Sequence, residues 1–562
     1  MTSKALEGMA IGRMGNRMSV CKESRLLMVL LILLTARVSA REVPITILHT
    51  CDLHGNVLPT EDYEGKTNVG GIARCATAIR QVREQEKNVL LVDAGDTLQG
   101  TPVSFLTDGQ VIVQCLNQLH YDSWTWGNHE FDWGLNKLAA CADRAEVPII
   151  VANVRGAKDG GNPNSKDILS RLKPYVVREI DGVKVGIIGL DTPDIPSWSR
   201  PRLINGLAFE DSVETLHKVI PEARAAGAQV LVLVCHQGYR EGGDDHANQI
   251  NAIARNFPEL DVIIGAHTHR NFPEFKVSQV LYSQADYYGI YLGRVDLVFD
   301  TDKGRVERRK SNTLLMDEKV SLDDRILKLT GAEIARAKKV ASTRLGEATD
   351  EFISRALPRK ETPIHDLIFE AIADALRERG VKVDAVVHGI LDRRDGLRKG
   401  PITVGDVWKV VPYENTIGTV ELLPGELREV LEEDLDAYDN NAFRGIWGLR
   451  WTFDPSAEKG QRTLSLRRSG GSQLDEKQKL VVAFNSYDLA GGGQRWKRLR
   501  ELADRPESKL VEYDFQTREA VIDYVRKRGT ITPNIANWWV AQHSVKADNS
   551  PGDNPPIGAK AQ

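Results

Sequence analysis

The segment VLLVDAGDTLQG, residues 89–100, carries an apolar run directly into a loop with two carboxylates, Asp93 and Asp96. Apolar runs at 43–48, 230–234 and 262–264 likewise precede short clusters of Asp, Asn and His. Runs of this length, alternating with helical stretches, are typical of strands in a sheet with helices on its faces. Such sheets gather ligands at the carboxyl ends of their strands. The sequence therefore predicts an α/β fold in which the clusters converge on one site.

The clusters contain the donor types that divalent metal ions prefer. They are Asp52-Leu53-His54, Asp93 to Asp96, Asn128-His129, His236 and His267-Thr268-His269. Carboxylate and amide oxygens with imidazole nitrogens suit two borderline ions, and they fit neither a nucleotide cradle nor a serine triad. In an extended strand, Asp52 and His54 would point to the same face and bind one ion. Asp96 follows Gly95, which permits a tight turn, and its two oxygens can bridge two ions.

The bulk composition is that of a globular protein with an ample core. The chain has 562 residues, of which 41% are hydrophobic and 27% charged, and its length suggests two to four domains. The net charge of −4 provides no basic field that would favour a nucleic acid polymer as partner. Five scattered cysteines follow residue 40, and this odd set indicates buried thiols more than a disulfide framework, with one bridge left open.

The first forty residues have the layout of a secretory signal peptide. Basic residues between 13 and 25 precede the apolar run 26–34, and small residues at 38–40 resemble a cleavage site. The apolar run is short for a membrane span, so an uncleaved anchor is the lesser alternative. We therefore expect an exported protein, periplasmic or extracellular, with no membrane attachment after cleavage.

The chain is expected to divide into a signal peptide at 1–40, a first domain at 41–315, a linker helix at 316–345, a second domain at 346–535 and a disordered tail at 536–562. The stretch 305–345 is charged and helix-prone, and a hairpin turn is expected at 300–304. In the second domain, the pattern predicts helices at 364–379 and 423–434 and strands at 385–387, 416–422 and 480–484. The tail is rich in Asp, Asn, Gly, Pro and Ala, a composition typical of disorder.

Five clusters in this order on alternating strands and helices resemble those of the calcineurin-like metallophosphoesterases. The resemblance is strongest to the exported branch that contains 5′-nucleotidases and 2′,3′-cyclic-nucleotide phosphodiesterases. The strings that carry it are Asp52-Leu-His54-Gly55, Asp93-Ala-Gly-Asp96-Thr-Leu-Gln-Gly100, Gly127-Asn-His-Glu-Phe-Asp132-Trp-Gly134, His236 and Gly265-Ala-His-Thr-His269. It implies a metallophosphoesterase sandwich for residues 41–315.

The resemblance also implies roles for individual residues. One ion would be bound by Asp52, His54 and His269, the other by Asn128, His236 and His267, and both by Asp96. His129 would contact the phosphoryl oxygens or the leaving group without binding metal, and Asp132 would orient its imidazole. The ligand set suits Mn, Zn, Fe or Co. Cys51 stands where the family usually has Asn, and we expect this departure to tune the site without abolishing it.

The second domain resembles the 5′-nucleotidase C-terminal domain, in which two aromatic rings sandwich a base and Arg side chains bind phosphate. The strings are Val387-His-Gly389, Arg393, Gly400-Pro-Ile-Thr403, Gly405-Asp406, Val411-Pro-Tyr413-Glu-Asn415-Thr416, Phe484-Asn-Ser-Tyr487 and Gly491-Gly-Gly493. Tyr413 and Tyr487 fall on the aromatic positions, Arg393 on an Arg position and Asn415 on an Asn that faces the base. Arg359 lies near a second Arg position. Stacking between rings tolerates any base.

Three departures from this second pattern concern polar contacts to the substrate. His388-Gly389-Ile390 replaces an Asn-Gly-Gly stretch, and one residue is inserted between Arg393 and Gly400. Gly493 stands where the family usually carries an Asp after the double Gly. Because stacking alone does not read the edge of a base, we expect weak discrimination among bases.

We therefore expect a dinuclear-metal phosphoester hydrolase that acts on nucleotides as a 5′-nucleotidase, a 2′,3′-cyclic phosphodiesterase or both. A metal-activated water would attack phosphorus in line, without a covalent phospho-enzyme. One alternative is a hydrolase of nucleotide-sugars or of another phospho- or thio-ester on the same scaffold. The other, from a different class, is an exported nucleotide-binding protein without turnover. The sequence leaves the oligomeric state open.

Overall fold

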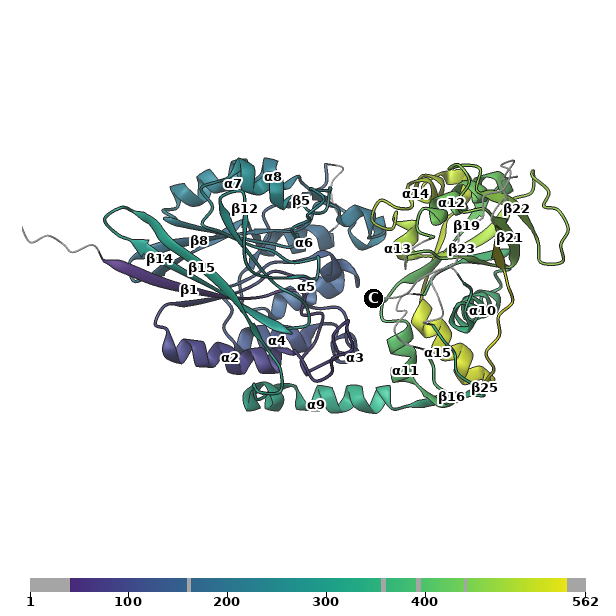
Figure 1. Ribbon diagram of the computed structural model, residues 1–562, viewed down its shortest axis with the longest axis horizontal. Helices are drawn as coiled ribbons and strands as arrows, with labels where there is room; N and C mark the ends of the chain where they lie inside the picture. Colours follow the sequence, from purple (N-terminus) through teal and green to yellow (C-terminus); the bar gives the residue numbers. More distant parts are fainter. Residues whose placement is uncertain (1–40, 159–162, 355–359, 391–395, 439–441, 543–562) are drawn as a thin grey trace, which may run out of the picture.

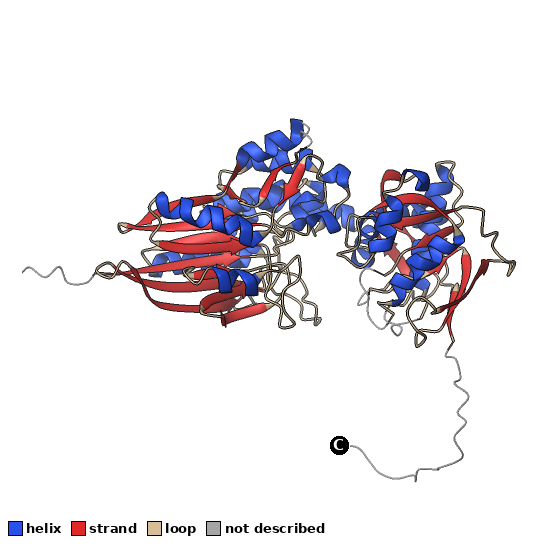
Figure 2. Ribbon diagram, turned by 90° about the horizontal axis from the view of Figure 1, so that it is seen from above, coloured by secondary structure: helices blue, strands red, loops and turns tan. Residues whose placement is uncertain are grey.

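The computed structural model describes residues 41–158, 163–354, 360–390, 396–438 and 442–542. These residues form two lobes joined along one side by the helix α9 (Asp324–Ala341), which packs against helices of both lobes (Figure 1). The view from above shows the same two separate groups of strands and helices (Figure 2). The expected signal peptide, most of the expected tail, Arg359 and Arg393 lie outside the described residues.

The N-terminal lobe is built on two sheets. The first orders β15 (Arg305–Leu315), β14 (Tyr291–Asp300), β1 (Glu42–Thr50), β2 (Val89–Asp93), β3 (Ser123–Trp124), β4 (Ile149–Ile150) and β6 (Leu172–Lys173). The second orders β12 (Asn271–Val277), β13 (Val280–Ala285), β11 (Val262–Ile264), β10 (Val230–Cys235), β8 (Val183–Leu190) and β7 (Tyr175–Ile180). Buried aliphatic side chains of both sheets, such as Ile47 and Val232, form one core between them. The predicted strands before the polar clusters are confirmed.

Helices cover the outer face of each sheet and complete an α/β/β/α sandwich. The first sheet packs against α2 (Ile72–Gln85), α4 (Gln110–Gln118) and α5 (Leu135–Arg144), and the second against α7 (Ser212–Ala225) and α8 (Ile250–Asn256) (Figure 1). Shorter elements are α3 (Pro102–Leu106), α6 (Pro163–Arg171), β5 (Val154–Gly156) and β9 (Leu207–Phe209). The short helix η1 (Asn128–Phe131) follows β3.

The expectation of a helix-prone segment at 305–345 is wrong for its first eleven residues. Residues 305–315 form β15, which pairs antiparallel with β14 across the predicted turn at 300–304. Val306 is buried while its charged neighbours are exposed, as expected for a strand with one side facing solvent. The linker helix itself begins at Asp324, and the Asp323 carboxylate caps it by accepting from the backbone N–H groups of Arg325 and Ile326.

The C-terminal lobe is a second α/β unit. Its main sheet orders β20 (Ile446–Trp447), β17 (Ala385–Val387), β23 (Leu480–Asn485), β19 (Thr416–Leu422) and β24 (Val511–Gln516). Two small sheets contain β18 (Gly400–Thr403), β16 (Arg344–Ala348) and β25 (Thr530–Ile531), and β22 (Thr463–Arg468), β21 (Leu449–Phe453) and β26 (Trp539–Ala541). The helices are α10 (Pro363–Glu378), α11 (Val404–Val410), α12 (Pro424–Leu435), α13 (Ser486–Leu489), α14 (Lys497–Ala503) and α15 (Thr517–Arg528).

The predicted helices and strands of this lobe are present within one or two residues of their expected bounds. The expected tail begins too early, because β26 lies beyond residue 535 and pairs parallel with β21. All five cysteines of the described chain are free thiols buried in the core of the N-terminal lobe, as expected: Cys51, Cys75, Cys115, Cys141 and Cys235. Across the ranges that the structure describes, no helix combines the length and apolar character needed to cross a membrane.

Candidate active site

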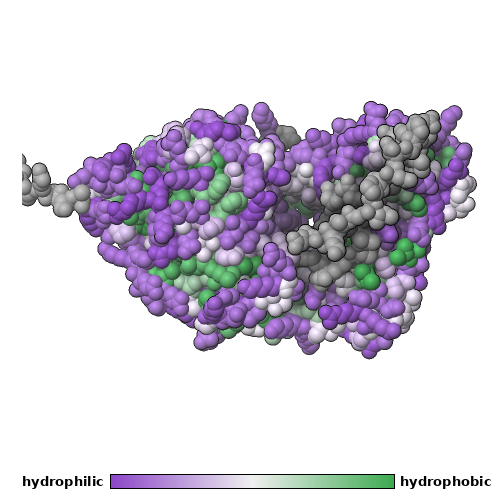
Figure 3. Space-filling model, in the orientation of Figure 1, coloured by the Kyte–Doolittle hydropathy of each residue, from purple (hydrophilic) through white to green (hydrophobic). Residues whose placement is uncertain are grey.

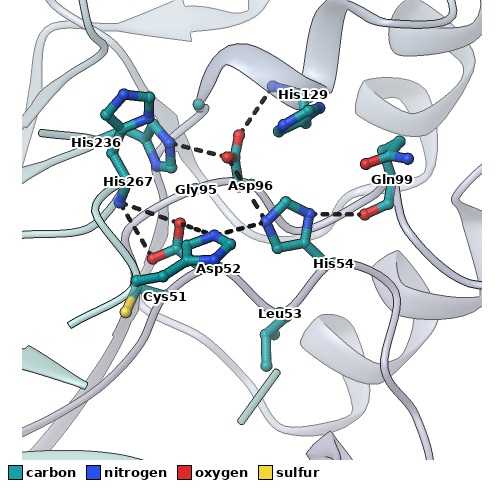
Figure 4. Close-up of polar contacts among 12 residues, drawn as sticks. Cys51, Asp52, Leu53, His54, Gly95, Asp96, Gln99, His129, His236 and His267 are labelled. Carbon is teal, nitrogen blue, oxygen red and sulfur yellow. Dashed lines mark hydrogen bonds and ion pairs between the residues drawn. The ribbon is translucent and has the colours of Figure 1, made fainter. Parts of the chain in front are cut away.

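The predicted polar clusters meet beyond the carboxyl ends of neighbouring strands (Figure 4). Residues of these clusters and residues of the C-terminal lobe line the same cleft. β1 and β2 lie side by side and parallel in the first sheet, and β10 and β11 do so in the second. Parallel strands end at the same edge of a sheet, and the stacking of the two sheets brings both edges together. This topology explains how residues more than 200 positions apart reach one site.

The first group of potential ligands contains Asp52, His54 and His269. Their ligand atoms all lie within 4.8 Å of one another. The Nε2 atoms of His54 and His269 are 3.1 Å apart, and Nε2 of His269 is 3.5 Å from Oδ1 of Asp52. The same carboxylate accepts from the backbone N–H of His267 at 3.0 Å, so it also ties the loops after β1 and β11 together.

The second group contains Asp96, His236 and His267, again within 4.8 Å. Oδ2 of Asp96 lies 3.0 Å from Nε2 of His236 and 3.8 Å from Nε2 of His54, which belongs to the first group. This carboxylate therefore sits between the two groups, where a bridging ligand belongs. Asn128 lines the same region, and its Oδ1 is buried without a hydrogen-bond partner among the described residues.

Hydrogen bonds on the far side of three rings present their Nε2 atoms to the centre. Nδ1 of His54 is 2.9 Å from the Gln99 carbonyl oxygen, and Nδ1 of His236 is 2.9 Å from that of Ala94. Nδ1 of His269 is 2.8 Å from the Tyr63 hydroxyl. A partner on one ring nitrogen fixes the tautomer and leaves the other nitrogen free for a metal ion.

The donor set fits two divalent metal ions. Carboxylate oxygens, imidazole nitrogens and an orphaned amide oxygen converge on a buried spot, and such mixed sites suit first-row transition metals. Cys51 does not take part, because its thiol donates to the carbonyl oxygen of Asp286 at 3.2 Å. Burial and the adjacent Asp52 carboxylate raise the pKa of this thiol well above its usual value, so it stays protonated.

Five of these side chains project from backbone in the left-handed region. The φ angles are 49° at Asp52, 47° at His54, 53° at Asp96, 70° at His267 and 51° at His269. Such a conformation costs about 1–3 kcal/mol per residue unless Gly occupies it, and it clusters at functional sites. The extended geometry expected for the first pair is therefore wrong: β1 ends at residue 50, and the pair lies in a loop. Its ligand atoms still meet.

Glu130 is a supporting residue that the sequence reading missed, although it lies inside the Gly-Asn-His-Glu string. Its buried carboxylate accepts four backbone N–H bonds, at 2.9 Å from Asp96, 2.7 Å from Thr97, 3.0 Å from Leu98 and 2.6 Å from Gly127. Burial and the Asp96 charge raise the pKa of Glu130 to about 8, although the backbone hydrogen bonds act to lower it. The carboxyl group joins the loops after β2 and β3.

His129 lies beside the two groups and has the partner predicted for it. Its Nδ1 is 2.7 Å from Oδ2 of Asp132, and its backbone N–H donates to Oδ1 of Asp96 at 2.8 Å. Burial opposes ionisation of the ring, but the charges of Asp132 and Asp96 outweigh it and raise the pKa of His129 to about 10. The contact with Asp132 leaves Nε2 available to a substrate.

A cleft of about 730 Å³ separates this centre from the C-terminal lobe. Asn128, His129 and His267 line one wall, while the predicted substrate residues Tyr413, Asn415 and Tyr487 all line the other. The ring of Tyr413 lies nearly parallel to the His129 imidazole, with centroids 6.4 Å apart. The visible surface of the N-terminal lobe beside the junction is predominantly hydrophilic (Figure 3).

Trp198, which the sequence reading did not single out, explains the glycine at 493. Its ring lies 5.1 Å from that of His267 and lines the cleft. A Cβ on Gly493 would lie 2.5 Å from the indole Nε1, and the φ of 66° also favours glycine there. His388 is buried and contacts the Thr517 hydroxyl at 3.1 Å without lining the cleft. The departures at positions 493 and 388 thus correspond to contacts with Trp198 and Thr517, respectively.

Side-chain and backbone contacts hold the two walls together. Gln99 Nε2 donates to Glu414 at 2.5 Å, and Glu414 forms a buried ion pair of 2.8 Å with Arg518. Near the other end of the cleft, Gln494 Nε2 donates to Asp194 at 2.8 Å. Because the carbonyl of Gln99 also contacts His54, the C-terminal lobe reaches the metal centre through one residue.

Comparison with known proteins agrees with this architecture. Residues 45–271 match the Calcineurin-like phosphoesterase family, and residues 329–501 match the 5′-nucleotidase, C-terminal domain family. A snake venom 5′-nucleotidase of Naja atra is 28% identical over 87% of this chain and 97% of its own length. A 2′,3′-cyclic-nucleotide 2′-phosphodiesterase/3′-nucleotidase of Haemophilus influenzae is 26% identical over 89% and 87%.

Among solved structures, a 5′-nucleotidase precursor of Thermus thermophilus superposes with a TM-score of 0.68 at 27% identity, covering 89% of this chain and 99% of that one. Fold, site and relatives together define a metallophosphoesterase, a hydrolase of phosphoric esters. More particularly, the chain belongs to the proteins that join a calcineurin-like phosphoesterase domain to a 5′-nucleotidase C-terminal domain.

Proposed function

We propose that this nucleotide phosphoester hydrolase acts on nucleoside monophosphates and 2′,3′-cyclic nucleotides. The observation that carries the proposal is the cleft, because it sets two tyrosine rings opposite a centre with ligands for two ions. In this arrangement the base stacks against Tyr413 and Tyr487, and the phosphoryl group reaches the wall formed by Asn128 and His267. Relatives named for both activities support this substrate class.

Two divalent ions, Mn, Zn, Fe or Co, would activate a water and neutralise charge on the phosphoryl oxygens. The protein's own residues position the remaining chemistry. Asp132 holds Nδ1 of His129, so Nε2 carries a proton toward the leaving ester oxygen. Trp198 packs beside His267 and Tyr413 lies nearly parallel to His129, so both rings flank the position of the ester in this arrangement.

The test is steady-state hydrolysis of four substrates after reconstitution with each metal. We expect turnover of AMP and 2′,3′-cyclic AMP, with bis-p-nitrophenyl phosphate as a reference that lacks a base. A strong preference for UDP-glucose would move the protein to the nucleotide-sugar alternative. Tight nucleotide binding by calorimetry with no turnover under any metal would instead establish the binding-protein alternative. Elemental analysis of protein purified without added metal identifies the native ions.

Export is the second part of the proposal. Relatives that include a venom enzyme and a precursor support it, as does the layout of residues 1–40 in the sequence. Cell fractionation followed by N-terminal sequencing is expected to find the enzyme outside the cytoplasm and beginning at Arg41. An intact N-terminus in the membrane fraction would favour the anchor alternative.

A further inference from the structure

A fully charged side chain is built into the C-terminal wall of the cleft and has no role in the chemistry above. Arg444 is 5% exposed. Its Nε lies 3.0 Å from Oδ2 of Asp488, and its Nη2 lies 3.0 Å from Oδ1 of the same carboxylate. Asp488 is itself fully buried and accepts from Asn485 Nδ2 at 2.6 Å. Two parallel contacts of this kind hold the guanidinium plane in one orientation.

The third nitrogen of this guanidinium, Nη1, donates to no acceptor within the described ranges. Arg444 lines the cleft together with Ile390, Ala442 and Tyr487. A Cβ at Gly389 would lie 2.7 Å from Cδ and 3.1 Å from Nη1 of Arg444, so the glycine leaves space for the guanidinium. Nη1 is not among the fully buried side-chain atoms that lack a partner, so it keeps accessible surface in the cleft that Arg444 lines. An oxygen or nitrogen acceptor on a molecule bound in the cleft can therefore complete its hydrogen bonding.

The position of Arg444 beside Tyr487 on the C-terminal wall favours the base as the source of that acceptor. The six grouped metal ligands lie in loops of the N-terminal lobe, and Asn128 begins the helix η1 of the same lobe. Arg444 comes from the opposite lobe and adjoins Tyr487, one of the two rings that would stack on the base. Asn415, on the same wall, offers both a donor and an acceptor, whereas a guanidinium offers donors alone.

We propose that Arg444 reads the edge of the base and selects a carbonyl oxygen over an amino group. The proposal rests on the nucleotide substrate class proposed above. A carboxylate at position 493 would accept hydrogen bonds and match amino groups, but Gly493 lacks one and Trp198 leaves no space for it. A fixed donor reverses that match, so 6-oxopurines and 4-oxopyrimidines are preferred. Base discrimination is thus stronger than stacking alone provides.

The experiment compares kcat/KM for two substrate pairs, IMP with AMP and UMP with CMP, which differ in an oxo or amino group and its adjacent ring nitrogen. The parent enzyme is expected to prefer the oxo member of each pair by roughly 10-fold. Arg444→Met would leave Asp488 buried without its counter-charge, so Arg444→Met/Asp488→Asn is made as well to keep the wall folded. In both variants the preference falls to within about twofold of unity, while bis-p-nitrophenyl phosphate hydrolysis stays within a few-fold.

Arg495→Met is the matched control, because Arg495 also lines the cleft but is exposed; its oxo-to-amino ratio remains that of the parent. An equal loss for all four nucleotides with unchanged ratios would overturn the proposal, and so would a parent enzyme without oxo preference. If no nucleotide is hydrolysed, the proposed function fails by itself. Calorimetric binding of IMP and AMP then tests Arg444 separately, and equal affinities would sink it.

Discussion

The two walls of the cleft differ in the burial and backbone conformation of their residues. On the N-terminal wall, Asp52 and His236 are completely buried, and five ligand residues adopt left-handed backbone. On the C-terminal wall, Tyr413 is 40% exposed, and the residues that line it come from four separate segments, at 390, 413–415, 442–444 and 487–495. Metal coordination requires fixed donor atoms, and the fold accepts backbone strain to fix them. Stacking on a flat base tolerates small displacements, so the opposite wall can vary.

The difference also shows in the departures from the family pattern. The metal wall departs at Cys51 alone among the strings that carry its resemblance, and that thiol is turned toward the Asp286 carbonyl. The substrate wall departs at three places, and Trp198 and Arg444 occupy space or supply charge there. Specificity is thus free to change on one wall while the reaction is retained on the other.

The largest loss of activity is expected from substitution of Asp96, on the N-terminal wall. Asp96→Asn removes the charge between the two groups and one anionic oxygen, and it also weakens the contact with the His129 backbone. We expect activity on every substrate to fall by more than roughly 10³-fold. Elemental analysis should find fewer than two ions per chain. Asn substitution at Asp181, a partly exposed carboxylate that pairs with Lys87, serves as the control. Normal turnover with two bound ions would remove Asp96 from the bridging position.

His129 separates chemistry from metal binding on the same wall. His129→Ala is expected to lower kcat by roughly 10²–10⁴-fold, because the leaving oxygen loses its proton donor. Metal content should remain that of the parent, since the imidazole is assigned no ligand role. Asp132→Asn, which keeps the shape of the partner, should lose less activity. Loss of an ion in the alanine variant, measured by elemental analysis, would make His129 a ligand instead.

Local pattern was sufficient to predict most of the fold. The run at 262–264 is the strand β11, and β1, β2 and β10 lie within two residues of their predicted bounds. Buried strands are short and apolar, so composition identifies them. The sequence of β15 predicts a helix-prone segment, because few of its residues face inward and many charged residues lie on its solvent side. Tertiary pairing with β14 decides its conformation.

The candidate site, too, could be predicted only in part from the sequence. The structure places six of the seven predicted ligands in two compact groups, and the seventh, Asn128, beside them. Strand ends and donor chemistry carry that prediction. Trp198, Glu414 and Arg444 were missed, because their importance comes from contacts with residues far along the chain: Gln99 and Glu414 are 315 positions apart. Such pairings leave no periodic signal in a single sequence.

Glu414 connects the two walls, so its substitution tests whether they act independently. Glu414→Gln leaves Arg518 buried without its counter-charge and alters the contact to Gln99. Breaking a buried pair typically costs 3–5 kcal/mol, so urea unfolding should show a loss of about 3 kcal/mol. We expect kcat/KM for AMP to fall by roughly 10-fold.

The control for this variant is Glu476→Gln, since Glu476 pairs with Arg428 on the surface and such pairs contribute about 0–1 kcal/mol. If the two walls act independently, Glu414→Gln will affect stability while leaving kcat/KM unchanged. That result would confine Glu414 to folding and remove the link through Gln99 to His54.

The smallest effect is expected on the substrate wall itself. Tyr413→Ala and Tyr487→Ala should each raise KM for AMP by roughly fivefold, equivalent to about 1 kcal/mol of stacking, with kcat little changed. The value lies at the low end of the stacking range because one ring is partly exposed and loses less on truncation. The double variant should show a larger rise. Bis-p-nitrophenyl phosphate, which has no base, should change only a few-fold, and the metal content should not change. If both variants treat AMP like the parent enzyme, the base does not bind between these rings, and the C-terminal wall recognises another part of the substrate.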